Sequence, residues 1–221
     1  MCIKTKSEMF CLGIVILSFA IAVYFYPMMP DKIASHWNIE GTVDGYMDKF
    51  WALFILPIIS VGLFLLFLAI PRIDPLKENI AKFRGYFDGF VVVIFLFLFY
   101  IFLLTILWNR GTRFDMGQVL SPAFGILIYY CGILVEHAKR NWFIGIRTPW
   151  TISSDVVWNR THAIGGKLFK LAGLIAVFGI FKVYSFYLVL VPIILVAIYL
   201  VVYSYFEYQK EMMKKPKKKK K

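Results

Sequence analysis

Apolar residues are grouped into long runs along this chain and do not alternate with polar residues. Five runs contain no Lys, Arg, Asp or Glu: Phe10–Tyr26, Phe50–Ile70, Gly89–Trp108, Val119–Val135 and Val183–Phe206. Each run approaches the ~20 residues with which an α-helix crosses a hydrocarbon core of about 30 Å. Runs without alternation favour membrane helices over the strands of a membrane barrel.

A sixth span is predicted when one shorter run is extended backwards. Leu168–Phe181 is too short alone, and starting it at Ile164 brings in Lys167 and Lys170. Two lysines three residues apart share a helix face, and their long side chains can reach the membrane surface. The predicted fold is therefore all-α, a polytopic integral protein of the cell membrane with six transmembrane helices.

The spans and the segments between them divide the chain into four parts. They are a two-helix unit at residues 1–70 with an outer loop at 27–49, the third and fourth helices at 71–135, a long inner loop with the last two helices at 136–206, and a polybasic tail at 207–221.

The composition and charge support this interpretation. Hydrophobic residues make up 60% of the chain, whereas soluble domains have roughly 45–50%, and disordered chains have fewer still. With the N-terminus inside, the outer segments hold only Lys32, Lys49, Arg110, Arg113 and Lys182 of the 25 lysines and arginines. Because cytoplasmic loops carry the excess of positive charge, both termini are predicted to be cytoplasmic.

The net charge of +12 would suggest nucleic acid as a partner for a soluble protein. Here it accounts for topology, and no direct contact with nucleic acid is expected. The tail Lys214–Lys221 is instead expected to attract anionic membrane lipids, and a solvated terminus that only strengthens topology is the alternative.

The outer loop, Pro27–Lys49, is longer than a connection needs to be. Asp31 is expected to cap a short amphipathic helical piece that carries Ile33, His36 and Trp37. Two interpretations stay open: a surface loop whose Trp37 and Tyr46 anchor at the lipid headgroups, or an outer recognition surface. The candidate recognition residues are His36, Trp37, Asn38, Gly41, Asp44 and Gly45.

The inner loop, Glu136–Gly166, is the second long segment. Ser153 or Ser154 is predicted to cap a helix that continues into the fifth span. On that helix, side chains at i, i+3, i+4 and i+7 share one face, namely Asp155, Trp158, Asn159 and His162. The alternative is a basic juxtamembrane helix with Trp142, Trp150 and Trp158 as interface anchors.

A connected unit is expected within this inner loop. Thr148-Pro149 turns the chain back, so Arg147 is expected to reach the face of Trp158 and His162 with its planar guanidinium. Two adjacent glycines let that helix approach a neighbour closely. The candidate residues of this inner site are Gly145, Arg147, Thr148, Pro149, Trp158, Thr161, His162, Gly165 and Gly166.

These two segments resemble a known family. Ile144–Lys167 reads IGIRTPWTISSDVVWNRTHAIGGK and is similar to the signature of the SdpI-like family, the immunity proteins against a sporulation-delaying peptide toxin. Pro30–Lys49 reads PDKIASHWNIEGTVDGYMDK and resembles the domain of unknown function that commonly opens such proteins.

This resemblance implies a six-span membrane protein that gives resistance to a secreted, membrane-active peptide toxin. In the type member of the family, the protein also binds an ArsR-type repressor at the membrane. The toxin and such a repressor are therefore the candidate protein partners.

No catalytic, cofactor or metal-site signature occurs in the sequence, so a non-enzymatic protein without a cofactor is expected. Two other functions stay open. One is a small transporter or flippase-like exporter of peptide or lipid, although the runs lack the acidic residues on which ion coupling depends. The other is a lipid-modifying enzyme with Asp155 and His162 as its acid–base pair.

Overall fold

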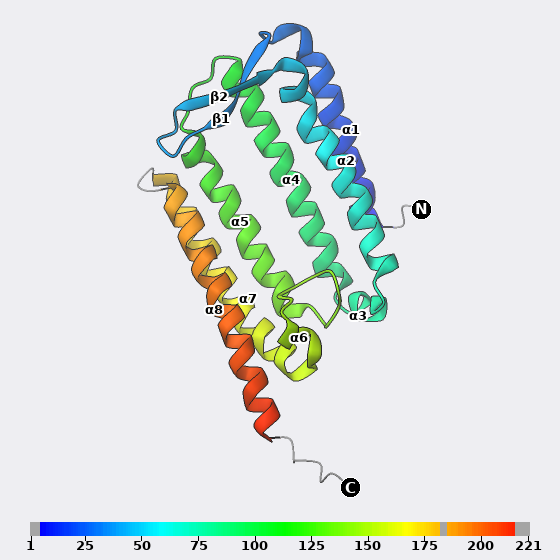
Figure 1. Cartoon of the computed structure of the whole chain (residues 1–221). Coiled ribbons are helices and arrows are strands. Elements are labelled where there is room, and N and C mark those ends of the chain that lie inside the picture. The colour runs from blue at the N-terminus through cyan, green and yellow to red at the C-terminus, as the bar shows by residue number, and fades with distance from the viewer. Residues whose placement is uncertain (1–4, 182–184, 215–221) are drawn as a thin grey trace.

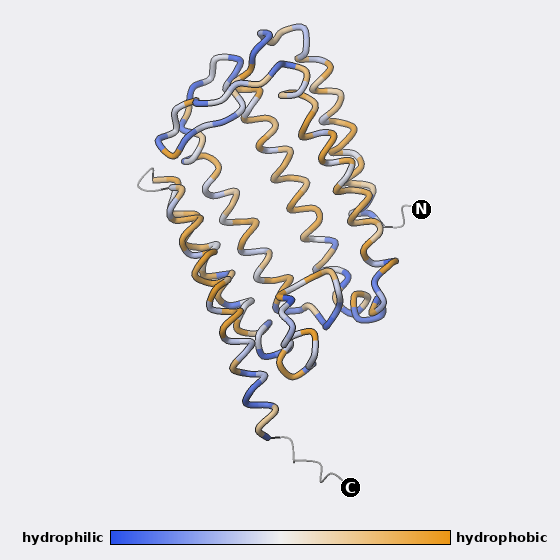
Figure 2. The backbone as a smooth tube through the Cα atoms, viewed as in Figure 1, coloured by the Kyte–Doolittle hydropathy of each residue, from blue (hydrophilic) through white to orange (hydrophobic). Residues whose placement is uncertain are grey.

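Six long helices dominate the computed structural model, which describes residues 5–181 and 185–214. They are α1 (Lys6–Phe25), α2 (Lys49–Ile73), α4 (Arg84–Asn109), α5 (Met116–His137), α7 (Asp155–Val177) and α8 (Ser185–Lys214). Each of them is long and apolar enough to cross a membrane. Figure 2 shows the apolar residues along these helices and the polar residues gathered at the two ends of the bundle. The prediction of six apolar helices is confirmed.

Short elements mark the two ends (Figure 1). One end, here called the hairpin end, carries strands β1 (Lys32–Trp37) and β2 (Val43–Asp48). The opposite end, the loop end, carries α3 (Lys77–Ala81), the loop at 138–148 and α6 (Pro149–Ser153). Two short 3₁₀ helices, η1 (Tyr26–Met28) and η2 (Phe178–Phe181), extend α1 and α7. Residues 182–184 and the Lys-rich sequence beyond Lys214 lie outside the described residues.

The outer segment corrects the all-α prediction. The helical piece expected after Asp31 is wrong, because Ile33, His36 and Trp37 lie on β1, which pairs antiparallel with β2. A helix of so few residues is unstable by itself. The tight turn between the strands is instead stabilised by Asn38, whose Oδ1 accepts hydrogen bonds from the amides of Glu40 and Thr42, each at 3.0 Å.

The helices form two groups of three. Helices α1, α2 and α4 pack together with β1, and Ile33, Leu53 and Phe102 are buried among them. Helices α5, α7 and α8 form the second group, with Ala172, Ala176 and Leu200 in its core. We call these groups the N-terminal half and the C-terminal half.

The N-terminal half is joined at the loop end by a network of charged side chains. Glu8 of α1 is almost buried, and its Oε1 lies 3.0 Å from Nη2 of Arg84 on α4 and 3.7 Å from Nη2 of Arg72 on α2. Arg84 also binds Asp88 at 2.6 Å. Because an unpaired buried charge is costly, this network holds the three helix ends together.

The C-terminal half is joined by backbone contact between α5 and α7. A Cβ atom added at Gly132 would lie 2.7 Å from the carbonyl oxygen of Gly166, and one added at Gly173 would lie 2.6 Å from the carbonyl oxygen of Gly125. Ser121 Oγ donates a hydrogen bond of 2.7 Å to the Ala176 carbonyl in the same seam. The two helices therefore touch without side chains between them, as small residues allow in membranes.

Replacing Gly132 with Ala is expected to destabilise the bundle. The added methyl group would meet backbone atoms of α7, which cannot turn away, so we expect a loss of about 1–3 kcal/mol, as is typical of overpacking. The unfolding temperature in detergent micelles, followed by tryptophan fluorescence, measures this effect.

Gly62→Ala is the matched control, because nothing lies within 4 Å of a Cβ atom at Gly62 in α2. That variant is expected to be neutral or slightly stabilised, since Ala favours a helix over Gly by roughly 0.5–1 kcal/mol. Equal unfolding temperatures for the two variants would contradict backbone contact between α5 and α7.

Candidate functional site

The 138–148 loop is folded around the side chain of Asn141, which is fully buried. Its Nδ2 donates to the carbonyls of Lys139 and Ile144, each at 2.8 Å. Its Oδ1 accepts from the amides of Phe143 at 2.9 Å and Ile144 at 2.6 Å. Sequence reasoning missed Asn141, although an Asn within a loop commonly binds the backbone that follows it.

His162 holds the loop against α7. Its ring is 1% exposed, Nε2 accepts a hydrogen bond of 3.0 Å from the amide of Ile146, and Nδ1 lies 2.8 Å from the Trp158 carbonyl. Because the Ile146 amide is a donor, Nε2 is the unprotonated nitrogen and Nδ1 carries the proton. Both ring nitrogens are thus used by the backbone.

Gly145 makes this approach possible. Its φ of +113° suits glycine, and a Cβ atom at this position would collide with Nε2 of His162. Gly165 has a similar role one turn further along α7, where a Cβ atom would collide with the Ile146 side chain. Gly166 instead faces Gly132 and Glu136 of α5. The two adjacent glycines therefore serve different contacts.

Trp158 is fully buried beside His162. Its Nε1 donates a 2.8 Å hydrogen bond to the Ala138 carbonyl, and its ring stacks on His162 with centroids 3.9 Å apart. The interface-anchor interpretation is therefore wrong for Trp158, whereas Trp142 is 51% exposed. The predicted common face of α7 is divided, because Asp155 and Asn159 are exposed while Trp158 and His162 are buried.

Thr148 and Pro149 begin α6, with Pro149 in its first turn. Thr148 Oγ1 accepts from the Thr151 amide at 3.2 Å, and Thr151 Oγ1 accepts from the Thr148 amide at 2.9 Å. Thr148 Oγ1 also lies 3.0 Å from Ser204 Oγ, which joins α6 to α8. Ser154 then caps α7, which confirms one of the two predicted caps. Thr161 is fully buried, and its Oγ1 has no hydrogen-bond partner within the described part of the chain.

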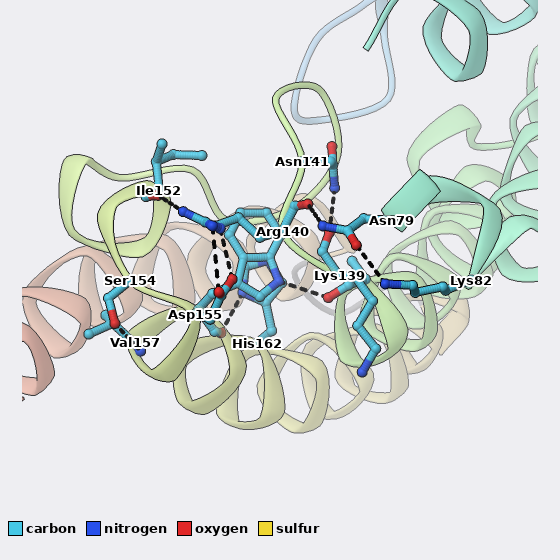
Figure 3. A network of polar contacts seen from close by, with 12 residues as sticks. Asn79, Lys82, Lys139, Arg140, Asn141, Ile152, Ser154, Asp155, Val157 and His162 are labelled. Carbon is cyan, nitrogen blue, oxygen red and sulfur yellow. Dashed lines mark hydrogen bonds and ion pairs between the residues drawn. The ribbon is translucent and has the colours of Figure 1, made fainter. Parts of the chain in front are cut away.

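Arg147 does not join the cluster of Trp158 and His162. Its side chain is exposed, and Nη1 donates a 2.6 Å hydrogen bond to the Trp142 carbonyl. The guanidinium that organises this region belongs to Arg140. Its Nε lies 2.7 Å from Asp155 Oδ1, and its Nη1 donates to the Ile152 carbonyl at 2.9 Å (Figure 3).

The loop is also bound to the N-terminal half. Asp74, at the end of α2, is 2% exposed, and its Oδ2 accepts from the Trp142 amide at 2.9 Å. Asn79 of α3 donates from Nδ2 to the Arg140 carbonyl at 2.8 Å, and its Oδ1 accepts from Lys82 (Figure 3). The 138–148 loop therefore connects the two halves at the loop end.

The β-hairpin lies across the two halves at the other end. Asn109, the last residue of α4, binds the backbone of Ala34 twice, with its Oδ1 2.9 Å from the amide and its Nδ2 3.0 Å from the carbonyl. A Cβ atom at Gly41 would lie 2.9 Å from Oδ2 of Asp115, which caps α5. The turn at Asn38–Thr42 thus touches the C-terminal half.

Several predicted outer residues are neighbours on the hairpin. His36 Nδ1 lies 2.5 Å from Asp44 Oδ1, and both side chains are substantially exposed. Gly45 is opposite His36, where a Cβ atom would come within 2.8 Å of the His36 Cβ. The Trp37 ring lies edge-on to Trp108 at 5.5 Å. The hairpin therefore presents a polar pair on one side and packs an aromatic ring against α4.

The acid–base pair considered from the sequence lacks support in this geometry. Asp155 binds Arg140, and both nitrogens of His162 bind backbone groups. Residues 5–181 and 185–214 contain no group of three or more His, Cys, Asp or Glu side chains that could hold a metal ion.

Comparison with known proteins matches both segments. Residues 137–204, from the end of α5 into α8, match the SdpI/YfhL protein family. This segment, which contains the 138–148 loop, α6 and α7, is thus similar to that family. Residues 13–61, from α1 through the hairpin into α2, match the domain of unknown function DUF1648. The resemblance inferred from the two motifs is confirmed.

The chain as a whole is also similar to a bacterial protein. It is 26% identical to the immunity protein SdpI of Bacillus subtilis (strain 168) over 209 residues, which cover 93% of this chain and 97% of that protein. No solved structure matches the chain.

His162→Ala is expected to loosen the 138–148 loop. The substitution removes the acceptor of the Ile146 amide, and an unsatisfied buried donor costs about 1–3 kcal/mol. We therefore expect faster tryptic cleavage after Arg140 and Arg147 in detergent micelles, measured by mass spectrometry of the fragments.

Asn159→Ala is the control for this experiment, because Asn159 lies on the same helix but is exposed. It is expected to be cleaved at the wild-type rate. If His162→Ala is also cleaved at that rate, the ring does not hold the loop.

Proposed function

We propose that this protein is a non-enzymatic immunity protein of the cell membrane that gives resistance to a membrane-active peptide toxin. The observation that carries the proposal is the similarity to the immunity protein SdpI over nearly the whole of both chains. Each matched region includes a polar segment at one end of the bundle. Residues 13–61 include the hairpin, and residues 137–204 include the 138–148 loop. A relative that shared only the apolar helices would support membrane insertion but not this function.

The hairpin is the proposed recognition element on the outer side of the membrane. The exposed His36–Asp44 pair offers an imidazole beside a carboxylate, and the neighbouring Trp37 and Trp108 rings offer apolar surface. Arg113 lies over the Trp108 ring, 3.8 Å from its centroid. Such a mixture suits an amphipathic peptide that arrives from water and enters lipid.

The 138–148 loop is the proposed inner element. It binds Asp74 and Asn79 of the N-terminal half and His162 of the C-terminal half. A change in the position of one half relative to the other would therefore move the exposed surface of this loop. If this side is cytoplasmic, as the distribution of lysine and arginine predicts, the loop can present that change to a repressor of the ArsR type. The lysine tail is proposed to bind anionic lipid on the same side.

Ion-coupled export is less well supported than immunity. Glu8, Asp88 and Glu136 lie within two turns of their helix ends, next to Arg84 or Lys170. A relay through the bilayer needs titratable groups near its centre.

The hairpin and the loop end of the bundle are expected to lie on opposite sides of the membrane. Reporter fusions after Glu40, in the hairpin turn, should be active outside, and fusions after Ser153, at the end of α6, should be active in the cytoplasm. Alkaline phosphatase and green fluorescent protein fusions at both positions measure this. If the fusions after Glu40 and Ser153 report the same side of the membrane, the six-span topology is wrong.

Expression in a sensitive host is expected to raise tolerance to the sporulation-delaying peptide. Trp37→Ala and Asp44→Asn should each lower that tolerance about tenfold, the effect of losing about 1.4 kcal/mol of binding, because they remove the aromatic and charged parts of the recognition surface. The minimal inhibitory concentration, with membrane abundance measured by immunoblot, tests the expectation.

The control is Lys32→Gln, which breaks the exposed 2.7 Å ion pair with Asp48 at the base of the same hairpin. Exposed pairs contribute little to stability, so this variant should protect as the wild type does. Wild-type protein that leaves tolerance unchanged across a panel of membrane-active peptides would refute the proposed function.

A further inference from the structure

The tip of the 138–148 loop leaves two large aromatic side chains exposed. Trp142 is 51% exposed and Phe143 is 37% exposed, although the residues on either side of them, Asn141 and Ile144, are buried. Asn141 Oδ1 accepts a 2.9 Å hydrogen bond from the Phe143 amide, so the backbone of the tip is fixed by the loop itself. The two rings are therefore held at the surface of a well-defined turn, and the packing of the loop does not account for them.

The tip lies at the depth where a membrane span ends. The Trp142 amide donates a 2.9 Å hydrogen bond to Oδ2 of Asp74, which directly follows α2. Helix α2 has 25 residues, and at ~1.5 Å per residue it is longer than the hydrocarbon core of about 30 Å. Its end therefore reaches the lipid headgroups, where Trp side chains are enriched in membrane proteins. Ile73, the last residue of α2, is 59% exposed, so apolar surface continues from the helix towards the loop.

Exposed cations without carboxylate partners surround the tip. Asn79 Nδ2 donates to the Arg140 carbonyl at 2.8 Å while its Oδ1 accepts from Lys82, so the segment around α3 and the loop form one surface (Figure 3). Glu78 adds one exposed carboxylate to this surface. Among the described residues, no ion pair is formed by four exposed basic side chains of this surface, namely Lys77, Lys82, Lys139 and Arg147.

The lysines that flank the β-hairpin are paired instead. Lys32 lies 2.7 Å from Asp48, and Lys49 lies 3.0 Å from Asp31. The unpaired cations of the loop end are thus available to a partner from outside the chain, and by charge complementarity that partner is anionic.

Arg147 brings one of these cations next to the aromatic tip. Its Nη1 donates a 2.6 Å hydrogen bond to the Trp142 carbonyl, and its side chain is exposed. That bond leaves most N–H donors of the guanidinium for another acceptor. The planar guanidinium fits phosphate oxygens in a bidentate manner. An aromatic ring and a phosphate-binding group are thus adjacent, which matches the boundary between the acyl chains and the headgroup of a phospholipid.

From this geometry we infer that the tip of the 138–148 loop is a binding site for an anionic phospholipid. Trp142 and Phe143 lie among the upper parts of the acyl chains, Arg147 binds the lipid phosphate, and the neighbouring lysines attract the negative charge. A soluble protein is less well suited to this surface, because the rings lie at the depth of the headgroups. The site is independent of the toxin proposed as ligand, and it belongs to the loop and not to the lysine tail.

Brominated lipids test the position of the tip, because bromine quenches only the Trp side chains that it contacts. The protein and its Trp142→Phe variant, which isolates the signal of Trp142, are reconstituted into phosphatidylcholine nanodiscs that contain a minor fraction of brominated phosphatidylglycerol or of brominated phosphatidylcholine. We expect both lipids to quench the Trp142 signal, and the anionic lipid to quench it more efficiently. Quenching by aqueous iodide and by neither lipid would place the ring in water, open to a protein partner, and would overturn the inference.

Arg147→Gln tests the anionic selectivity in the same measurement, again with and without Trp142→Phe. We expect the preference for phosphatidylglycerol at Trp142 to fall about fivefold, which corresponds to the ~1 kcal/mol of one cationic side chain near an anionic surface. The unfolding temperature should stay unchanged, because Arg147 is exposed. Lys32→Gln removes one positive charge at the hairpin end and should keep the wild-type preference. Equal quenching of the wild type by the two lipids, or a preference that survives Arg147→Gln, would contradict the proposed site.

Discussion

The backbone contact between α5 and α7 is the constraint on which the rest of the C-terminal half depends. Gly125 and Gly132 on α5 meet Gly173 and Gly166 on α7, so the two helices pack closely without intervening side chains. Beyond this seam, Glu136 and Lys170 form a 2.7 Å ion pair between the same helices. The end of α5 and the start of α7 are thereby fixed, and the chain between them must fold back within a small space.

That restricted space explains the composition of the 138–148 loop. A buried loop must satisfy its own backbone groups, and here side chains do so: Asn141 binds three backbone neighbours, Trp158 binds the Ala138 carbonyl and His162 binds the Ile146 amide. Gly145 is needed because the chain passes directly over the His162 ring. The Gly, Asn, Trp and His residues of this segment are therefore explained together by one packing problem, and the exposed Arg147 lies outside it.

Features that depend on local sequence could be predicted, and those that depend on distant partners could not. Five charge-free runs, and a sixth extended through Lys167 and Lys170, predicted the six helices, and Ser154 was among the predicted caps. The hairpin is the exception, because its strands are neighbours in the sequence. It was missed because the strongest turn pair, Asp44-Gly45, lies within β2, whereas the turn is formed at Asn38–Thr42. The burial of Trp158 was missed because it depends on the Ala138 carbonyl at the start of the loop, to which its Nε1 donates. The role of Arg140 was missed because its guanidinium reaches Asp155 and the Ile152 carbonyl across the fold of the loop. The close approach at Gly165 and Gly166 was foreseen, but the two different partners were not.

The two halves are stabilised by different means, and this affects how they can move relative to each other. Glycine contacts make α5 and α7 a rigid pair, whereas the N-terminal half is joined to them by the α4–α5 seam and by a clamp at each end. One clamp is the contact of Gly41 with Asp115, and the other is the binding of Asp74 and Asn79 to the 138–148 loop. A change in the angle between the halves would alter both contacts, because each of them crosses from one half to the other. The two halves are thus joined by polar contacts at the two ends of the bundle, whereas α5 and α7 are joined by glycines along their length, so the joint between the halves is the less rigid of the two.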